Sequence, residues 1–133
     1  MIHVITLNVN GLKDRAKRLQ IYSWFSNQNG NVLFIQETHF TNELIVNHDI
    51  YDWPDGVSYH SCGASNARGV SILIKSSANI KVNDIHTDEN GRMLMINTVI
   101  DDQKTTLMNI YAPNNIKERY NFYTKMFKKI DQH

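Results

Sequence analysis

The chain has 133 residues, of which 41% are apolar and 20% are charged, a composition typical of one soluble globular domain and not of a disordered or fibrous chain. Fourteen basic and thirteen acidic residues leave a net charge of +1, so no global field draws the protein toward nucleic acid. A single cysteine, Cys62, excludes an intrachain disulfide, and no apolar run reaches the roughly 18 residues of a membrane helix, so we expect an intracellular protein, nuclear or cytoplasmic, without a membrane partner.

The first part of the sequence predicts a strand, a helix and a second strand. Residues 2–7 are apolar and β-branched, which indicates a buried strand, and the turn-forming residues 8–11 end it. From about residue 14 to residue 27, apolar side chains recur at helical spacing. Residues 32–35 form a second short apolar run that ends at Gln36-Glu37. A strand–helix–strand unit of this kind usually has parallel strands.

The rest of the chain predicts antiparallel strands followed by a helix. Residues 38–56 give no clear pattern apart from a turn at their end. Strands are predicted over residues 70–75, 80–86, 93–100 and 105–111, with a hairpin turn at residues 88–91, and a final amphipathic helix over about residues 117–130. This order indicates an α/β fold with one mixed sheet that carries helices on its outer face. In this interpretation the opposite apolar face of the sheet has no cover.

Polar side chains follow both of the predicted parallel strands. Glu37 lies at the edge where open α/β sheets place their ligands, and its carboxylate suits Mg²⁺. The alternative is a carboxylate that caps a helix or faces solvent. Asn8 and Asn10 follow the first strand, although Asn-x-Asn-Gly can also serve only as a turn. His39 comes two residues after Glu37, so it is either a substrate contact or a surface histidine.

Two further segments contain candidate phosphate contacts. The segment Asn109-Ile110-Tyr111-Ala112-Pro113-Asn114 ends the last predicted strand, and a tyrosine hydroxyl or an asparagine amide there can bond a phosphate oxygen. A core tyrosine with its hydroxyl at the rim is the alternative. The basic residues after the first turn either contact a phosphate backbone or form a solvated helix face; they are Lys13, Arg15, Lys17 and Arg18. The sequence contains no glycine-rich phosphate loop and no zinc-ligand spacing.

The order of these segments resembles that of a known family. The segments that carry the resemblance are Leu7-Asn8-Val9-Asn10-Gly11-Leu12, residues 32–39, residues 68–74 and residues 109–114. Together they are similar to the endonuclease/exonuclease/phosphatase superfamily, and most of all to the endonuclease domain of non-LTR (LINE-type) retrotransposons, which are relatives of the apurinic/apyrimidinic endonucleases. The resemblance implies the N-terminal part of a four-layer α-β-β-α sandwich. It also implies hydrolysis of DNA phosphodiesters with Mg²⁺ or Mn²⁺ and no small-molecule cofactor.

The resemblance also implies roles for individual residues. Glu37 would hold the catalytic metal, Asn8 would help to position metal and phosphate, and Tyr111 would contact the scissile phosphate. Asn114 lies in the neighbouring family motif, and Asn10 stands where repair relatives often have aspartate. We expect Asn10, Asn114, His39, Lys13 and Arg15 to contact the substrate.

Two later segments of the family pattern are missing from this sequence. The family continues with G-D-x-N and S-D-H segments, the second of which supplies the histidine base, and neither occurs in these 133 residues. We therefore expect residues 1–133 to be the N-terminal portion of one such domain, inactive alone, with further retrotransposon domains in a longer gene product. The alternatives are a non-catalytic nucleic-acid-binding remnant and a phosphatase of the same superfamily.

Overall fold

The computed structural model describes residues 2–47, 53–63 and 67–132. The elements in chain order are β1 (Val4–Asn8), α1 (Arg15–Ser26), β2 (Val32–Gln36), α2 (Asn42–Asn47), β3 (Gly56–Ser61), β4 (Val70–Lys75), the 3-10 turn η2 (Ser76–Ala78), β5 (Lys81–Thr87), β6 (Met93–Ile100), β7 (Gln103–Ile110) and α3 (Ile116–Gln132). The predicted strands and the first and last helices agree with these bounds to within a few residues. The short helix α2 and strand β3 were not predicted.

The strands form two sheets instead of the single mixed sheet expected from the sequence. The first sheet has the order β1-β2-β4-β3, with β1 and β2 parallel as predicted and β4 antiparallel to both of its neighbours. The second is the antiparallel sheet β5-β6-β7. The separation comes from the turn after β4, where η2 is followed by Asn79 in the left-handed region with a φ of 56°. This turn carries β5 out of the first sheet, so the expected single sheet is corrected to two.

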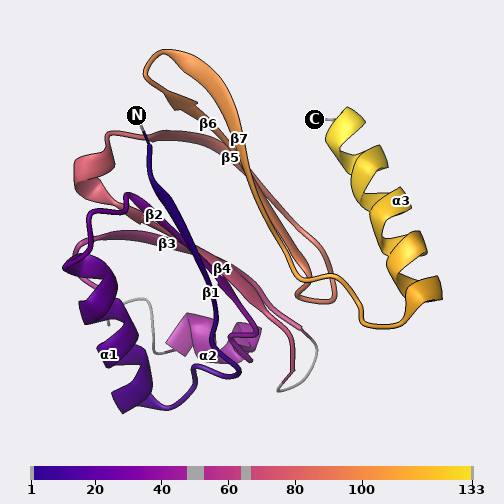
Figure 1. Cartoon of the computed structure of the whole chain (residues 1–133), viewed down its shortest axis with the longest axis horizontal. Helices are drawn as coiled ribbons and strands as arrows, with labels where there is room; N and C mark the ends of the chain where they lie inside the picture. Colours follow the sequence, from indigo (N-terminus) through magenta and orange to yellow (C-terminus); the bar gives the residue numbers. More distant parts are fainter. Residues whose placement is uncertain (1, 48–52, 64–66, 133) are drawn as a thin grey trace.

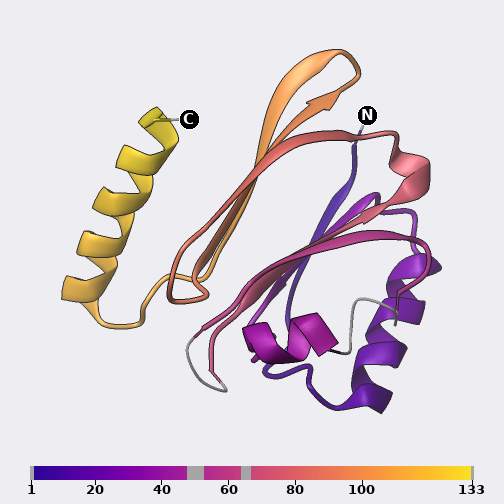
Figure 2. The same ribbon diagram turned by 180° about the vertical axis from the view of Figure 1, so that it is seen from behind.

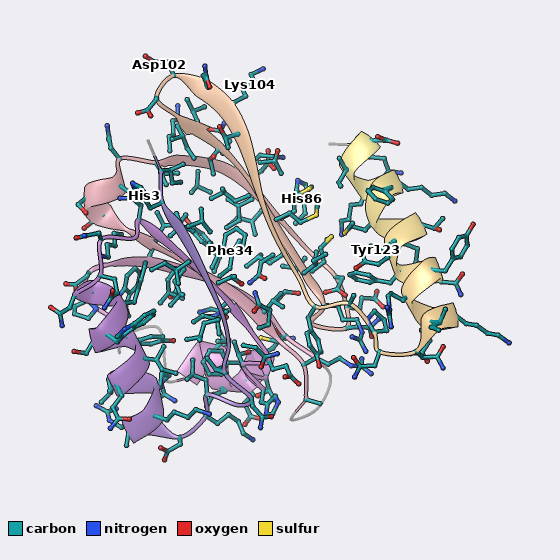
Figure 3. The ribbon with its side chains drawn as sticks, viewed as in Figure 1. His3, Phe34, His86, Asp102, Lys104 and Tyr123 are labelled. Carbon is teal, nitrogen blue, oxygen red and sulfur yellow. The ribbon has the colours of Figure 1, made fainter. Side chains whose placement is uncertain are left out.

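The two sheets pack face to face and bury the apolar surface that was expected to be uncovered. In β4, Val70, Ile72 and Ile74 share a core with Leu94 and Ile96 of β6. The sequence interpretation missed this cover because it placed all the strands in one plane. Figure 3 shows Phe34 of β2 in the space between the sheets.

A second core lies on the outer side of the first sheet. Tyr22 and Phe25 of α1 pack there against Leu33 and Ile35 of β2, and Leu73 of β4 joins them. Helix α1 begins with Asp14 as its cap, whose side chain accepts a hydrogen bond from the amide of Lys17 at 3.0 Å. Because β2 and β4 contribute to both cores, their side chains are buried on both faces, which explains their continuous apolar runs.

The layers follow the order helix, sheet, sheet, helix. Figure 1 shows α1 and α2 on one side of the first sheet, the second sheet on its other side, and α3 beyond the second sheet, and the reverse view in Figure 2 agrees. The expected α-β-β-α sandwich is thus confirmed. None of the helices in the described part of the chain has the length and apolar character needed to cross a membrane.

Helix α3 is held at its two ends and leaves much of its apolar surface exposed. The guanidinium of Arg119 donates to the carbonyl oxygens of Pro113 and Asn114, and the ammonium of Lys129 donates to the carbonyl oxygen of Thr87 at 2.8 Å. The side chain of Met126 on α3 is buried. Large apolar side chains remain exposed on it, namely Ile116, Tyr120, Phe127 and Ile130. The exposed apolar surface of this chain therefore includes α3, and the inner sheet faces are covered.

Candidate active site

Five chain segments meet at one edge of the sandwich. Because β1 and β2 are parallel, their carboxyl ends lie together, and the antiparallel strands bring the starts of β4 and β6 and the end of β7 to the same edge. Backbone hydrogen bonds join the segments in series, from Gly11 N to Glu37 O (2.7 Å), from Thr38 N to Gly69 O (3.0 Å), from Gly69 N to Gly91 O (2.9 Å) and from Tyr111 N to Arg92 O (2.8 Å). These backbone hydrogen bonds fix the relative positions of the segments that carry the candidate site residues.

The backbone at this edge has an unusual conformation. Non-glycine residues with positive φ gather there, namely Asn10 (48°), Glu37 (59°), His39 (62°) and Arg68 (62°). Such conformations cost free energy, are sparsely populated and tend to gather at functional sites. Gly69 also has a positive φ, of 94°, and a Cβ at this position would lie 2.3 Å from the hydroxyl oxygen of Thr38. The sequence alone could not predict that Glu37 itself adopts the left-handed conformation.

Glu37 and Tyr111 are brought together at this edge although 74 residues separate them. The hydroxyl of Tyr111 donates a hydrogen bond to Oε1 of Glu37 at 3.0 Å, and both residues are half-buried. Burial raises the pKa of the Tyr111 hydroxyl, and the hydrogen bond and negative charge of Glu37 raise it further, whereas Arg92 opposes the shift. Tyr111 is therefore a neutral hydrogen-bond donor at physiological pH.

Asn8 and Asn10 form a turn beside the Glu37 segment. The side-chain oxygen of Asn8 accepts a hydrogen bond from the amide of Asn10 at 3.1 Å, which is the bond of an Asx turn. This bond supports the turn interpretation for the Asn-x-Asn-Gly sequence. A carbonyl oxygen has two lone pairs, so the exposed Asn8 oxygen retains capacity for a second partner.

The other predicted substrate contacts lie on loops and on the start of α1. The ring of His39 packs against the loop after β1, because a Cβ added to Gly11 would lie 2.9 Å from its Nδ1. Lys13, Arg15 and Asn114 are exposed. Among the described residues, no hydrogen bond is recorded between the side chains of His39, Lys13 and Asn114 and those of Glu37 and Tyr111.

Two of the basic residues noted beside the first turn have structural roles. Arg18 is 4% exposed, and its guanidinium donates to the carbonyl oxygens of Leu12 and Lys13. The ammonium of Lys17 donates to the carbonyl oxygen of Val9. These bonds fix the loop after β1 against α1, so only the exposed members of the basic cluster present their charges to solvent.

The edge offers oxygen ligands for one hard cation. The described residues include no group of three or more histidine, cysteine, aspartate or glutamate side chains that could hold a metal ion. Within the same residues, Glu37 has one recorded side-chain partner, Tyr111 on Oε1, which leaves Oε2 for another partner. Mg²⁺ in phosphate-processing sites is commonly bound by one or two carboxylates, waters and the substrate phosphate. One carboxylate with a nearby amide oxygen fits such a site and does not fit an all-protein cage.

Asn109 holds the site together, whereas the sequence interpretation named it only as part of the segment 109–114 with candidate phosphate contacts. This residue is 1% exposed and joins the two sheets: its amide donates to the carbonyl oxygens of Ile35 (2.9 Å) and Ser71 (2.8 Å). Its side-chain oxygen accepts a hydrogen bond from the amide of Gln36 at 2.8 Å. These bonds hold the end of β7, and with it Tyr111, over the end of β2. The only signal in the sequence is an asparagine two residues before the tyrosine.

Arg92 also contacts Tyr111 and was not identified from the sequence. Its guanidinium lies over the Tyr111 ring, 5.6 Å from the ring centroid, and donates to the Tyr111 carbonyl oxygen at 3.1 Å. The segment that carries Arg92 is in turn held by Asp88, whose carboxylate accepts hydrogen bonds from the amides of Arg92 and Met93 and from the hydroxyl of Ser61. The tyrosine is therefore fixed through its hydroxyl, its ring and its carbonyl.

The sequence of this chain matches a known protein family over most of its length. The sequence matches the Endonuclease/Exonuclease/phosphatase family over residues 5–128. The chain therefore belongs to that family. A curated relative, the Transposon TX1 uncharacterized 149 kDa protein of Xenopus laevis, is 28% identical over 125 residues, which cover 94% of this chain and 9% of the relative.

Solved structures show the same fold. An AP endonuclease from Archaeoglobus fulgidus matches 98% of this chain and 49% of its own with a TM-score of 0.68 and 20% identity. The catalytic domain of Xenopus laevis APE2 matches 90% of this chain and 48% of its own with a TM-score of 0.63 and 19% identity. The TDP2 of D. rerio, solved as a complex with a single-strand DNA product, matches 98% of this chain and 54% of its own with a TM-score of 0.67 and 20% identity. The chain thus spans about half the length of these structures.

Proposed function

We propose that this chain carries the metal-binding half of a Mg²⁺-dependent endonuclease that hydrolyses DNA phosphodiester bonds. The observation that carries the proposal is the hydrogen bond between Glu37 and Tyr111 at the edge where five chain segments meet. A carboxylate that can hold a hard cation and a neutral donor that can bond a phosphate oxygen lie side by side there.

The residues present suit the charge requirements of phosphoryl transfer. Glu37, with the side-chain oxygen of Asn8, would hold Mg²⁺ or Mn²⁺, and when bound such an ion neutralises charge on the phosphate oxygens. Tyr111 would donate its hydroxyl proton in a hydrogen bond to a non-bridging phosphate oxygen. Asn10, His39, Asn114, Lys13 and Arg15 would contact the substrate around this point. The raised pKa of Tyr111 keeps the donor protonated, so it adds no negative charge beside the phosphate.

DNA is the substrate that the comparisons favour. One of the similar structures is a complex of TDP2 with a single-strand DNA product, and another is a 3′ phosphatase from Neisseria bound to a product DNA hairpin, which matches 92% of this chain with a TM-score of 0.64. The TX1 relative belongs to a transposon. These likenesses support an endonuclease of a LINE-type retrotransposon. We propose in addition that it acts in the nucleus or cytoplasm and is linked to further retrotransposon domains.

A general base is also required, and we propose that it lies outside residues 1–133. Hydrolysis needs a group that accepts the proton of the attacking water. His39 is the histidine closest in sequence to Glu37, and within the described residues no carboxylate is recorded as orienting its ring. Residues 1–133 would then form the N-terminal portion of one catalytic domain and would be inactive alone.

Cleavage of supercoiled plasmid DNA tests this function. The protein expressed from its natural reading frame should nick plasmid in Mg²⁺ and should stop when EDTA is added. Inositol phosphates and other small phosphate esters should be poor substrates. Hydrolysis of inositol phosphates in preference to plasmid would favour a phosphatase of the same family. Binding of plasmid without nicking in either Mg²⁺ or Mn²⁺ would favour a non-catalytic remnant.

A further inference from the structure

A surface pocket beside the Glu37 and Tyr111 edge has an excess of positive charge that the proposed hydrolysis does not use. The pocket measures about 350 Å³ and lies between α3, the loops of the second sheet and the loop that precedes β4 of the first sheet. Arg68, Arg92 and Lys125 line it together with the ring of Phe122, and Glu118 is the one carboxylate among the described residues that line it.

The two arginines are held next to each other by the backbone. Arg68 precedes Gly69 and Arg92 follows Gly91, and the amide of Gly69 donates to the carbonyl oxygen of Gly91 at 2.9 Å. A second bond, from the amide of His39 to the carbonyl oxygen of Arg68 at 2.7 Å, fixes Arg68 in its left-handed conformation. The hydrogen bond between Gly69 and Gly91 therefore holds the neighbouring residues Arg68 and Arg92 close together.

No salt bridge in the described part of the chain pairs with the positive charge of these two arginines. Burial lowers the pKa of Arg92, and the nearby charge of Arg68 lowers it further, while Glu118 and Asp88 act in the opposite direction. Arg68 and Arg92 repel each other, and the carboxylates of Glu118 and Asp88 offset this repulsion only by charge interaction and not by a recorded salt bridge, so a bound anion would relieve it.

Arg92 is also oriented in advance for binding. One of its five N–H groups is used in the bond to the Tyr111 carbonyl oxygen, and the guanidinium rests on the Tyr111 ring. The remaining donors form a planar fork of the kind that binds phosphate in a bidentate manner. Because the group is already fixed, little conformational entropy is lost when an anion binds.

We propose that Arg68 and Arg92 bind a backbone phosphate of the nucleic acid next to the one bound by Tyr111. Contact between Arg92 and the Tyr111 ring ties the two positions together, so a strand whose scissile phosphate lies at Glu37 and Tyr111 places a neighbouring phosphate at the arginine pair. Lys125 and the Phe122 ring would meet the sugar or base attached to it. The inference rests on the proposed nucleic-acid substrate, whereas its test requires no cleavage.

Binding of a fluorescent oligonucleotide duplex in EDTA, followed by anisotropy over a range of salt concentrations, tests the proposal. Loss of one phosphate contact should reduce the slope of log affinity against log salt by about 0.9 for duplex DNA. We expect Arg68→Gln to reduce the slope by about this amount and to weaken binding roughly 10-fold at low salt. Arg92→Lys, which keeps the charge but loses the planar fork, should keep the slope and weaken binding less.

Lys104→Gln is the matched control. Lys104 is exposed on the long hairpin at the end of the molecule away from the start of α3, where Figure 3 labels it, and its removal should change neither slope nor affinity. The proposal is overturned if Arg68→Gln and Lys104→Gln bind alike while circular dichroism shows both folded. Competition by millimolar inorganic phosphate as effective as competition by an oligonucleotide would also overturn it, because the site would then serve a free phosphate. Failure of the proposed hydrolysis would instead appear as absent nicking with the Arg68 effect intact.

Discussion

The hydroxyl of Tyr111 lies 3.0 Å from Oε1 of Glu37 and donates a hydrogen bond to it, although β7 and β2 belong to different sheets. The contact exists because Asn109 ties the end of β7 to the backbone of β2 and β4. Because the Tyr111 hydroxyl donates to the candidate metal ligand Glu37, it can donate to a phosphate oxygen instead when a substrate binds. The relationship leads to separate predictions for the tyrosine, the asparagine and the glutamate.

In the protein expressed from its natural reading frame, Tyr111→Phe should reduce turnover of plasmid DNA by roughly 10- to 100-fold, because one hydrogen bond to a charged phosphate contributes about 1.5–3 kcal/mol. Steady-state nicking kinetics measure the effect. Tyr59→Phe is the control, since Tyr59 packs between the sheets away from this edge. Unchanged turnover with a shifted melting temperature would mean that the Tyr111 hydroxyl only supports the fold.

The nicking rate should not change near pH 7 through ionisation of Tyr111. Burial and Glu37 raise the pKa of its hydroxyl above the usual value of 10, so the donor form persists throughout physiological pH and is lost only in more alkaline solution. The pH profile of wild-type nicking compared with that of Tyr111→Phe measures this. A change in the wild-type nicking rate near pH 7 that is absent from Tyr111→Phe would contradict this prediction.

Replacement of Asn109 by alanine should destabilise the protein by about 3 kcal/mol. The change removes the amide that donates to the buried carbonyl oxygens of Ile35 and Ser71, and the loss of a donor to a buried group costs about 1–3 kcal/mol for each bond. Urea unfolding measures the loss. Asn83→Ala, at an exposed position on β5, should change the free energy of unfolding by less than about 0.5 kcal/mol. Equal stability of the two variants would show that Asn109 does not hold the sheets together.

Acid should destabilise the protein through His60 on β3. Its Nδ1 lies 2.6 Å from the hydroxyl oxygen of Ser71, its ring packs edge-on against Phe40, and its Nε2 is buried with no partner among the described residues. Burial lowers the pKa of His60 from 6.5 to about 4. Between these values the unfolded chain binds a proton that the folded chain does not, so stability falls as the pH drops from about 6.5 to about 4, by roughly 3 kcal/mol in total.

The free energy of urea unfolding between pH 4 and pH 7 checks this prediction. His60→Gln should remove most of the slope against pH, whereas His3→Gln, at an exposed histidine, should keep it. A slope that is the same in wild type and His60→Gln would assign the acid sensitivity to other groups.

The sequence predicted most of the elements because their hydrophobic spacing is local. The parallel pair β1 and β2 and the meander β5 to β7 follow directly from apolar runs and turn residues. The division into two sheets was not predicted, since it depends on the left-handed conformation of Asn79 after η2. Strand β3 was missed because its half-exposed residues carry little apolar pattern.

The candidate site was predicted in part. Glu37 and Tyr111 were identified as strand-end residues, but their contact depends on packing between the sheets, which no local pattern encodes. Arg92 was given no role, and the structural role of Asn109 was not predicted, because their partners are 19 to 74 residues away in the chain. Arg18 was assigned to a basic surface, whereas the structure buries it against backbone carbonyl oxygens of the adjacent loop.

Glu37 is the proposed metal ligand, and binding of Mn²⁺ to residues 1–133 tests this assignment most directly. Paramagnetic Mn²⁺ should broaden the backbone NMR signals of Glu37 and Tyr111 at low stoichiometry and leave those of Lys104 sharp, and excess Mg²⁺ should reverse the effect. Glu37→Gln, which is nearly isosteric but uncharged, should abolish this broadening, whereas Glu43→Gln on α2 should retain it. Equal broadening in wild type and Glu37→Gln would contradict the assignment.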